Sequence, residues 1–214
     1  MKTELITNVS HDIKTPLTMI KAYAEMIKDI SGDNPVKRNE HLDVILQETE
    51  YLDKLVSDMS ELSKLQSGVI EIRRDNFDLK HCTDNVVRLL SQAIKEKNVS
   101  LILDLDESVV YADEIKISQV IYNFLSNALK YSDDSSKITI RIRENEEWTR
   151  FEIEDHGNGI SQEALPYIWD RYYKVDKNFN RSVSSTGLGL AIAKAILEAH
   201  KARYGVESKL NEGS

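Results

Sequence analysis

The chain has 214 residues, 41% hydrophobic and 30% charged, which is typical of a globular protein with one or two cores. Its net charge is −8, and the halves on either side of Ser67-Gly68 carry −4 each (8 Lys+Arg against 12 Asp+Glu, then 20 against 24). Neither half is basic, which argues against nucleic-acid partners. The single cysteine, Cys82, excludes an intrachain disulfide and a cysteine-based metal cluster.

No apolar run approaches the roughly 18 residues that a membrane span requires, and no signal-peptide pattern is present. The sequence is compatible with the cytoplasmic part of a longer, membrane-anchored protein. Met1 to Leu5 already lies within a helical pattern, and the chain ends where a final strand is expected. We therefore expect a cytoplasmic location and no direct membrane contact within this stretch.

The first 68 residues predict a helical hairpin. Apolar residues recur at helical spacing over 1–30 and again over 36–66, and the polar run SGDNP between them predicts a turn. Two such helices form an antiparallel pair that leaves much of both apolar stripes exposed. Pairing of two hairpins into a four-helix bundle would cover these stripes, so we expect a homodimer.

From residue 69 onward the pattern changes to strands alternating with helices. Helices are predicted over 78–98, 113–131 and 187–200, and KITIRIREN and EEWTRFEIED alternate at period two, as an antiparallel pair does. Further strands are predicted at VIEI, VSLILDL, SVVYAD and finally RYGVES. Together these elements predict a two-layer α/β sandwich. A polar run over 156–186 is long enough to be a functional or mobile loop.

His11 is predicted to project from the outer side of the first helix. At about 100° per residue it lies roughly 180° from the apolar centre near Ile13, with Thr15 on its own side. Pro16 follows within the same helix, where a proline costs on the order of 3 kcal/mol because it deletes a backbone hydrogen bond. We expect it to free the carbonyl of Asp12 and to bend the helix beside His11.

The segment SHDIKTPLT, residues 10–18, closely resembles the phosphoacceptor box of sensor histidine kinases, in which a His is followed by an acid, then by Thr or Asn and Pro. The resemblance implies that His11 is the residue phosphorylated. It also implies that Asp12 orients the ring and accepts a proton from one nitrogen, leaving the other as nucleophile. Thr15 would position a water for the reverse, phosphatase reaction toward a partner.

Four segments of the second region have features of a nucleotide site. The helix over 113–131 places Asn123 and Asn127 one turn apart, with amide oxygens suited to Mg²⁺. DHGNGI offers Asp155 at a strand end, able to accept a hydrogen bond from an amine such as that of adenine, followed by two glycines that permit a tight turn. IWDRYYKVD is an aromatic run fit to anchor a lid. TGLGLAIAK is a glycine turn opening a helix, where N–H groups favour phosphate.

In order and spacing, these segments look like the asparagine, first glycine, aromatic and second glycine boxes of the histidine-kinase ATP-binding domain, which has the GHKL or Bergerat fold. The resemblance implies Mg²⁺ and ATP, with Asn123 and Asn127 near the metal and Asp155 reading adenine. No P-loop motif is present. The other residues that the resemblance assigns to the nucleotide are Lys130, Tyr131, Gly157, Gly159, Thr186, Gly187, Leu188 and Gly189.

Two positions depart from that family pattern. Ser185 stands where the second glycine box usually has a further glycine, and we expect the lid to close differently because serine adopts positive φ at a cost. The helix that follows ends in His200-Lys201-Ala202 instead of HGG, which costs about 1 kcal/mol or less and moves the chain reversal. Neither departure touches Asn127 or Asp155, so nucleotide binding is still expected.

The sequence therefore predicts a protein histidine kinase. Residues 1–68 would form a dimerisation and histidine-phosphotransfer hairpin, and residues 69–214 an ATP-binding domain lacking its last strand. ATP would phosphorylate His11, and the group would pass to an aspartate of a response-regulator receiver domain. Two alternatives stay open: a GHKL-type ATPase or serine kinase, and a non-enzymatic dimeric scaffold with a degenerate lid. Phosphorylation within one subunit or across the dimer also stays open, since it depends on how the SGDNP turn passes the chain.

Overall fold

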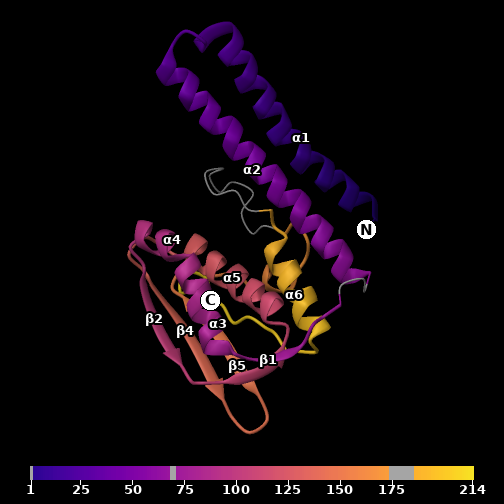
Figure 1. The fold of residues 1–214 in the computed structure, drawn as a ribbon, viewed down its shortest axis with the longest axis vertical. Coiled ribbons are helices and arrows are strands. Elements are labelled where there is room, and N and C mark those ends of the chain that lie inside the picture. Colours follow the sequence, from indigo (N-terminus) through magenta and orange to yellow (C-terminus); the bar gives the residue numbers. More distant parts are fainter. Residues whose placement is uncertain (1, 68–70, 174–185) are drawn as a thin grey trace. The chain divides into compact units, whose positions relative to one another are not determined.

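The computed structural model describes residues 2–67, 71–173 and 186–214 (Figure 1). The chain divides into two compact units, the first comprising residues 1–61 with Thr186 and the second the remaining described residues from Leu62 onward. The first unit is helical and the second is mixed α/β. Among the described residues, no helix is both long and apolar enough to cross a bilayer.

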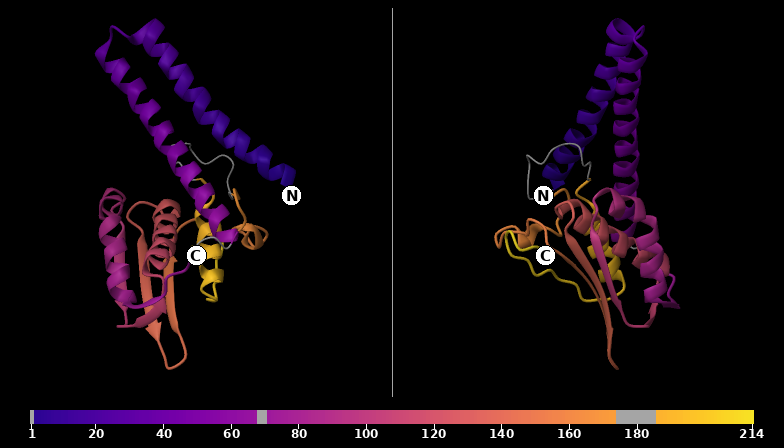
Figure 2. Two further views of the ribbon diagram at one scale, coloured as in Figure 1. Left: turned by 45° about the vertical axis from the view of Figure 1, so that its right-hand side comes forward. Right: turned by 90° about the vertical axis from the view of Figure 1, so that its left-hand side faces the viewer.

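The first unit is a helical hairpin, as predicted. α1 (Lys2–Met26) continues through Pro16 as one α-helix, and a π-helical turn (Ile27–Ser31) follows where the sequence predicts ordinary helix to residue 30. α2 (Pro35–Gln66) begins with a proline, and the side chain of Asn34 accepts hydrogen bonds from two N–H groups of its first turn. α1 and α2 run antiparallel (Figures 1 and 2).

The second unit is a two-layer α/β sandwich, as predicted. Its sheet has the order β2-β4-β5, with β2 parallel and β5 antiparallel to β4, and β1 pairs with β3 in a separate antiparallel ribbon. Figures 1 and 2 show helices gathered over one face of the sheet. In chain order the elements are β1 (Asp75–Asp78), α3 (Leu79–Leu89), α4 (Ser91–Glu96), β2 (Ser100–Leu105), β3 (Val109–Ala112), α5 (Glu114–Tyr131), β4 (Lys137–Glu144), β5 (Thr149–Asp155) and α6 (Gly189–Ala199).

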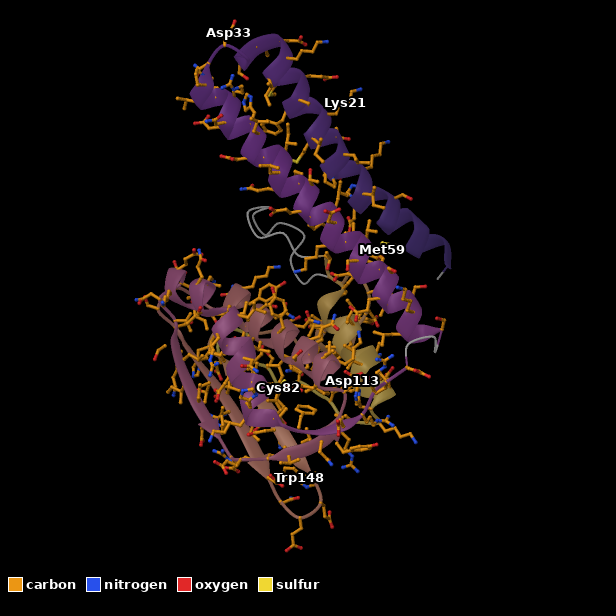
Figure 3. The ribbon with its side chains drawn as sticks, viewed as in Figure 1. Lys21, Asp33, Met59, Cys82, Asp113 and Trp148 are labelled. Carbon is orange, nitrogen blue, oxygen red and sulfur yellow. The ribbon has the colours of Figure 1, made fainter. Side chains whose placement is uncertain are left out.

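The core lies between the central strand β4 and the helices. Ile138, Ile140 and Ile142 of β4 are fully buried and belong to one apolar cluster with Leu125 of α5 and Cys82 of α3. Burial raises the pKa of the Cys82 thiol to about 11, so this residue remains a neutral core group (Figure 3). The other face of the sheet carries ion-paired arginine and acidic side chains, as expected for a solvated surface.

Three predictions about this unit are wrong. The segment 78–98 is not one helix, because the chain breaks at Leu90, whose φ of −92° and ψ of 7° separate α3 from α4. RYGVES forms no strand, and only an isolated bridge between Lys209 and Gly213 follows it. Within the described ranges the first strand is β1: Glu71 and Ile72 are outside any strand, and the first two residues of VIEI lie outside those ranges.

The long polar run is described as far as residue 173 and includes a 3₁₀ turn at Leu165–Tyr167. The predicted join at Gly68 and the departure from the family pattern at Ser185 lie outside the described residues. The described residues therefore include both glycine segments, one at the end of β5 and the other at the start of α6.

Candidate functional site

His11 projects into solvent from α1, as predicted. Its side chain is 79% exposed, whereas that of the neighbouring Asp12 is 24% exposed. Nδ1 of the ring lies 3.5 Å from Oδ1 of Asp12, at the long limit of a hydrogen bond. A proton held on Nδ1 by this carboxylate leaves the lone pair on Nε2, the nitrogen that can act as a nucleophile.

The residues after His11 interact with their own helix. The Thr15 hydroxyl donates to the carbonyl oxygen of His11 across 3.1 Å. Pro16 has no N–H, so the carbonyl of Asp12 lacks its usual intrahelical donor. The free carbonyl is thus adjacent to the exposed imidazole, and Pro16 does not interrupt α1.

Asn123 and Asn127 lie one turn apart on α5, and both are half-buried. The amide Nδ2 of Asn123 donates to the carbonyl of Gly189 across 3.0 Å. A Cβ added to Gly189 would lie 3.3 Å from Oδ1 of Asn123, so α5 and the start of α6 meet closely. The Asn127 amide makes no hydrogen bond with any described residue, which leaves it available to a ligand.

Asp155, at the last position of β5, faces the loop that follows it. Its Oδ1 accepts a hydrogen bond from the N–H of Gly157 across 2.9 Å. Burial raises the pKa of this carboxyl, although the Gly157 N–H and the charge of His156 oppose that shift. A half-buried carboxylate with one oxygen engaged by the backbone is a selective acceptor for a ligand N–H.

The first glycine loop, residues 155–160, reaches the end of α5. A Cβ on Gly157 would lie only 2.2 Å from the carbonyl oxygen of Tyr131, so only glycine fits at this approach. The ammonium of Lys130 donates to the Tyr131 hydroxyl across 3.1 Å and lies 4.6 Å from the centre of that ring. The structure thus places the end of α5, with Lys130 and Tyr131, against the loop that carries Asp155 and Gly157.

The second glycine segment leads into α6. Gly187 has a φ of +68°, and its carbonyl accepts from the N–H of Tyr172 across 2.9 Å. Leu188 is fully buried, so its side chain belongs to the core. Thr186 opens the last described segment, and α6 starts at Gly189. The first turn of α6 therefore presents free N–H groups of the kind that bind phosphate.

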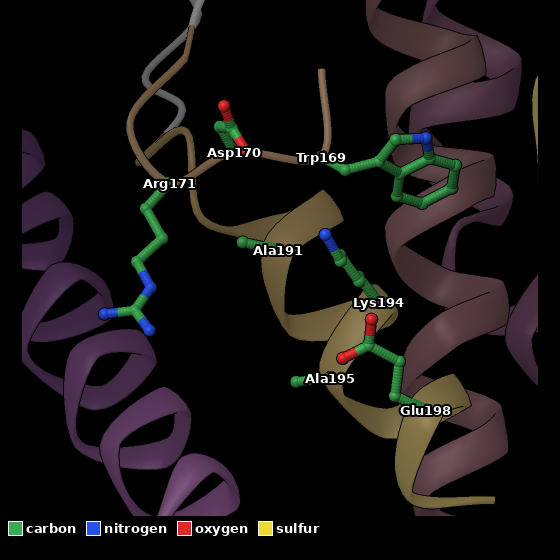
Figure 4. Close-up of a pocket in the computed structure, with 7 residues that line it drawn as sticks. All are labelled: Trp169, Asp170, Arg171, Ala191, Lys194, Ala195 and Glu198. Atoms are coloured by element: carbon green, nitrogen blue, oxygen red, sulfur yellow. The ribbon is translucent and has the colours of Figure 1, made fainter. Parts of the chain in front are cut away.

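Part of the predicted aromatic cluster packs on α5. The Trp169 ring lies 6.2 Å from that of Phe124 and 4.9 Å from that of Tyr204, edge-on to both. A separate surface pocket lies between this tryptophan and α6 (Figure 4). Both positively and negatively charged side chains line this pocket. None of the residues predicted to bind the nucleotide is among its lining residues. The pocket is lined by Trp169, Asp170, Arg171, Ala191, Lys194, Ala195 and Glu198.

Sequence reasoning missed the residues that support the first glycine loop. The N–H of Asp155 donates to the carbonyl of Ser214 across 2.8 Å, and the N–H of Ile160 donates to the hydroxyl of Ser208 across 2.8 Å. These contacts join segments far apart in the chain, and no local spacing indicates them. The serine and glycine content of the last seven residues was the only available signal.

Two family models match the chain, one after the other. The His Kinase A (phospho-acceptor) domain matches residues 1–68, and the histidine kinase-, DNA gyrase B- and HSP90-like ATPase matches residues 112–214. Sensor histidine kinase YkoH of Bacillus subtilis is 31% identical over 211 residues, which cover 99% of this chain and 46% of YkoH. Sensor histidine kinase WalK of the same species is 34% identical over 212 residues, 92% of this chain and 33% of WalK. The chain spans less than half the length of either relative.

Solved structures share the fold of both units. The Acinetobacter baumannii histidine kinase AdeS gives a TM-score of 0.78 at 25% identity, over 95% of this chain and 93% of that one. Histidine kinase ThkA, solved in complex with the response regulator protein TrrA, gives a TM-score of 0.79 at 23% identity, over 98% of this chain and 59% of that one. The second likeness shows a shared fold and nothing further.

Proposed function

The chain belongs to the sensor histidine kinases, with their phosphoacceptor domain followed by their ATPase domain, and we propose that it uses ATP to phosphorylate its own His11. The observation that carries this proposal is the imidazole itself. Its side chain is 79% exposed within the matched phosphoacceptor domain, and Nδ1 faces the Asp12 carboxylate at 3.5 Å. The ring is therefore reachable and has a proton acceptor beside it.

In the proposed step, Nε2 of His11 forms a bond to the γ-phosphorus of ATP. The bond between that phosphorus and the bridging oxygen breaks, and ADP leaves with the electron pair. The ring proton on Nδ1 passes to Asp12, so the product is a neutral phosphohistidine ring. Little covalent chemistry is asked of the protein, and positioning with charge neutralisation supplies most of the rate.

We assign the nucleotide to the site between α5, the first glycine loop and the start of α6. Asp155 would accept a hydrogen bond from the exocyclic amine of adenine, with the Tyr131 ring beside the base. Lys130 and the N–H groups at Gly187 and Gly189 would face the phosphates. The close approaches at Gly157 and Gly189 support this assignment, because they keep the loop and both helices within reach of one ligand.

The asparagine pair of α5 suits the Mg²⁺ that the family implies. Asn123 engages only its Nδ2 in the bond to Gly189, and Asn127 has no hydrogen bond with the described residues, so both amide oxygens remain for a hard cation. When bound, Mg²⁺ would neutralise charge on the phosphates. Asn127 is the better placed of the two, since its whole amide is uncommitted.

We further propose that the hairpin forms a homodimer. Large apolar side chains of α1 and α2 are exposed in the single chain, including Leu17 at 51%, Leu46 at 59% and Val56 at 58%. Apolar side chains at this spacing on a surface indicate a covered interface. Two copies packed as a four-helix bundle would cover these residues.

The partner we propose for the phosphoryl group is an aspartate of a response-regulator receiver domain. ThkA, which shares the fold, was solved with a response regulator protein bound. The phosphoramidate on His11 is reactive enough to transfer the group onward. Thr15, one turn from His11, is the residue we assign to the reverse, phosphatase reaction. Since the reaction consumes ATP, the cytoplasm is the compartment we propose.

The test compares His11→Gln with His81→Gln, a matched control in which the replaced histidine is an exposed residue of α3. With γ-³²P-ATP, we expect label on the wild type and on the control but none on His11→Gln, while all three bind ATP equally. The label should be acid-labile and base-stable. Label that persists on His11→Gln would overturn the assignment. Acid-stable label would identify a serine kinase, and absence of ATP binding would identify a scaffold.

A further inference from the structure

The last seven residues form a loop that lies directly against the first glycine loop. We call residues 208–214 the C-terminal loop. The N–H of Asp155 donates to the Ser214 carbonyl across 2.8 Å, and the Ser214 N–H donates back to the Asp155 carbonyl across 3.3 Å. Further along, the N–H of Asn211 donates to the carbonyl of Asn158 across 2.8 Å. The two loops are thus joined through their backbones at more than one point.

Glycine on each side permits this contact. A Cβ on Gly159, whose φ is +63°, would lie 2.0 Å from the carbonyl oxygen of Lys209. A Cβ on Gly213, whose φ is +106°, would lie 2.0 Å from the carbonyl oxygen of Asp155. Both distances are far below van der Waals contact, so the position of one loop fixes that of the other.

The Ser208 hydroxyl connects the two loops. Its Oγ accepts the N–H of Ile160 across 2.8 Å and donates to the carbonyl of Gly213 across 2.7 Å. The Ser214 hydroxyl lies 2.8 Å away and must be the donor to Ser208, whose only proton is already used. One small side chain therefore satisfies a backbone group of each loop and uses its full hydrogen-bonding capacity.

We propose that Ser208 is a positioning residue for base recognition, holding the first glycine loop so that Asp155 meets the adenine amine. This inference rests on the proposed function, in which Asp155 reads the base. Removal of the hydroxyl leaves the Ile160 N–H without its acceptor, and the Gly213 carbonyl keeps only the N–H of Lys209. The loop that carries Asp155 thereby loses part of its support. The phosphate-binding groups at Gly187 and Gly189 belong to another segment. Ser208 therefore acts on base selectivity and not on phosphoryl transfer.

The test measures dissociation constants for ATP and GTP, together with KM and kcat for His11 labelling, on the 214-residue chain. We expect Ser208→Ala to weaken ATP binding roughly tenfold, the effect of about one lost hydrogen bond. GTP binding should change by less than about threefold, because guanine has an acceptor oxygen where adenine has its amine, and the Asp155 carboxylate has no proton to donate to it. KM for ATP should rise while kcat at saturating ATP stays within about twofold of the wild type. The reason is that contacts to the base stabilise bound ATP and the transition state equally.

Two further variants keep the proposal falsifiable. Ser208→Thr retains the hydroxyl and should keep most of the preference for ATP over GTP. Ser208→Cys has only a weakly hydrogen-bonding thiol, so it should show the losses expected of Ser208→Ala and can replace that variant in the test if Ser208→Ala fails to fold. Ser161→Ala is the matched control, since the Ser161 hydroxyl makes no hydrogen bond with the described residues. Equal losses of ATP and GTP binding in Ser208→Ala, or a fall in kcat at unchanged KM, would overturn the proposal. Failure of the wild type to bind ATP would instead count against the proposed function.

Discussion

The backbone N–H of Asp113 donates to Nε2 of His200 across 3.0 Å, so one imidazole joins the start of α5 to the end of α6. Nδ1 of the same ring donates to the carbonyl of Ile196 across 2.8 Å, which places the proton on Nδ1 and leaves Nε2 as the acceptor. The carboxylate of Asp113, a residue labelled in Figure 3, in turn accepts from the backbone N–H groups of Arg73 and Lys116. The helices that carry Asn127 and the second glycine segment are thereby tied at one end.

We expect His200→Leu to lower the free energy of unfolding by about 2 kcal/mol, because it leaves the buried Asp113 N–H without an acceptor. His200→Gln should recover part of this loss, since its amide oxygen can reach the same N–H. Denaturant unfolding of the three chains is the measurement. His81→Gln, at an exposed position of α3, should stay within about 0.5 kcal/mol of the wild type. A His200→Leu chain as stable as the wild type would contradict this account.

Lys201 occupies a conformation that glycine adopts more readily. Its φ is +58°, and the N–H groups of Lys201 and Ala202 donate to the carbonyls of Glu198 and Leu197, which is the Schellman arrangement at the end of α6. The chain therefore reverses at Lys201, directly after His200. Lys201→Gly should raise stability by about 1 kcal/mol. Lys201→Ala retains a Cβ and should not raise stability. Equal increases in the melting temperatures of both variants would count against strain at this residue.

Those parts of the fold with strong local patterns could be predicted from sequence. His11 was placed on the exposed side of α1 from helical periodicity, and α5, β4 and β5 lie where their apolar spacing indicates. The break at Leu90 was not predicted, because leucine is a good helix former and the only local signal is Ser91, without a glycine or proline. β1 has the sequence DNFD, which has low strand propensity, and it becomes a strand by pairing with β3.

The candidate site divides in the same way. Asn127, Asp155 and the glycines belong to compact motifs, which is why the sequence alone proposes them as site residues. Ser208 and His200 act through partners 48 and 87 residues away, and no motif connects such positions. RYGVES shows the alternation of a strand but pairs with no strand among the described residues. Alternation alone therefore predicted a strand that the fold does not form. What sequence could not supply was therefore the tertiary support behind the motif residues.

Gly159 and Gly205 should respond oppositely to the same change. Gly159 has a φ of +63° and no room for a Cβ, whereas Gly205 has no atom within 4 Å of an added Cβ. We expect Gly159→Ala to cost more than about 2 kcal/mol, since strain at positive φ adds to the overlap with the Lys209 carbonyl. Gly205→Ala should change stability by less than about 0.5 kcal/mol. Thermal unfolding of both variants is the check, and similar melting points for the two would contradict the packing described between the loops.

Asp155 should make the fold less stable as it ionises. Burial raises the pKa of its carboxyl above the ordinary 3.8, against the opposing effects of the Gly157 N–H and the His156 charge. The folded state then binds this proton more tightly than the unfolded state does. The stability from this group is fully present below pH 3.8 and is lost as the pH rises through the raised folded value.

Asp155→Asn removes that ionisation while its amide oxygen can still accept the Gly157 N–H. We expect the variant to be more stable than the wild type at pH 7 and to show no gain below pH 3.8, with ATP affinity reduced at least roughly tenfold. Melting temperatures measured between pH 3 and pH 8 test the sign. Asp104→Asn is the contrast, because hydrogen bonding to Arg143 lowers the pKa of the Asp104 carboxyl and its replacement should destabilise at neutral pH. If Asp155→Asn were less stable than the wild type at pH 7, this carboxylate would be held by structural interactions and not kept at a cost for a ligand.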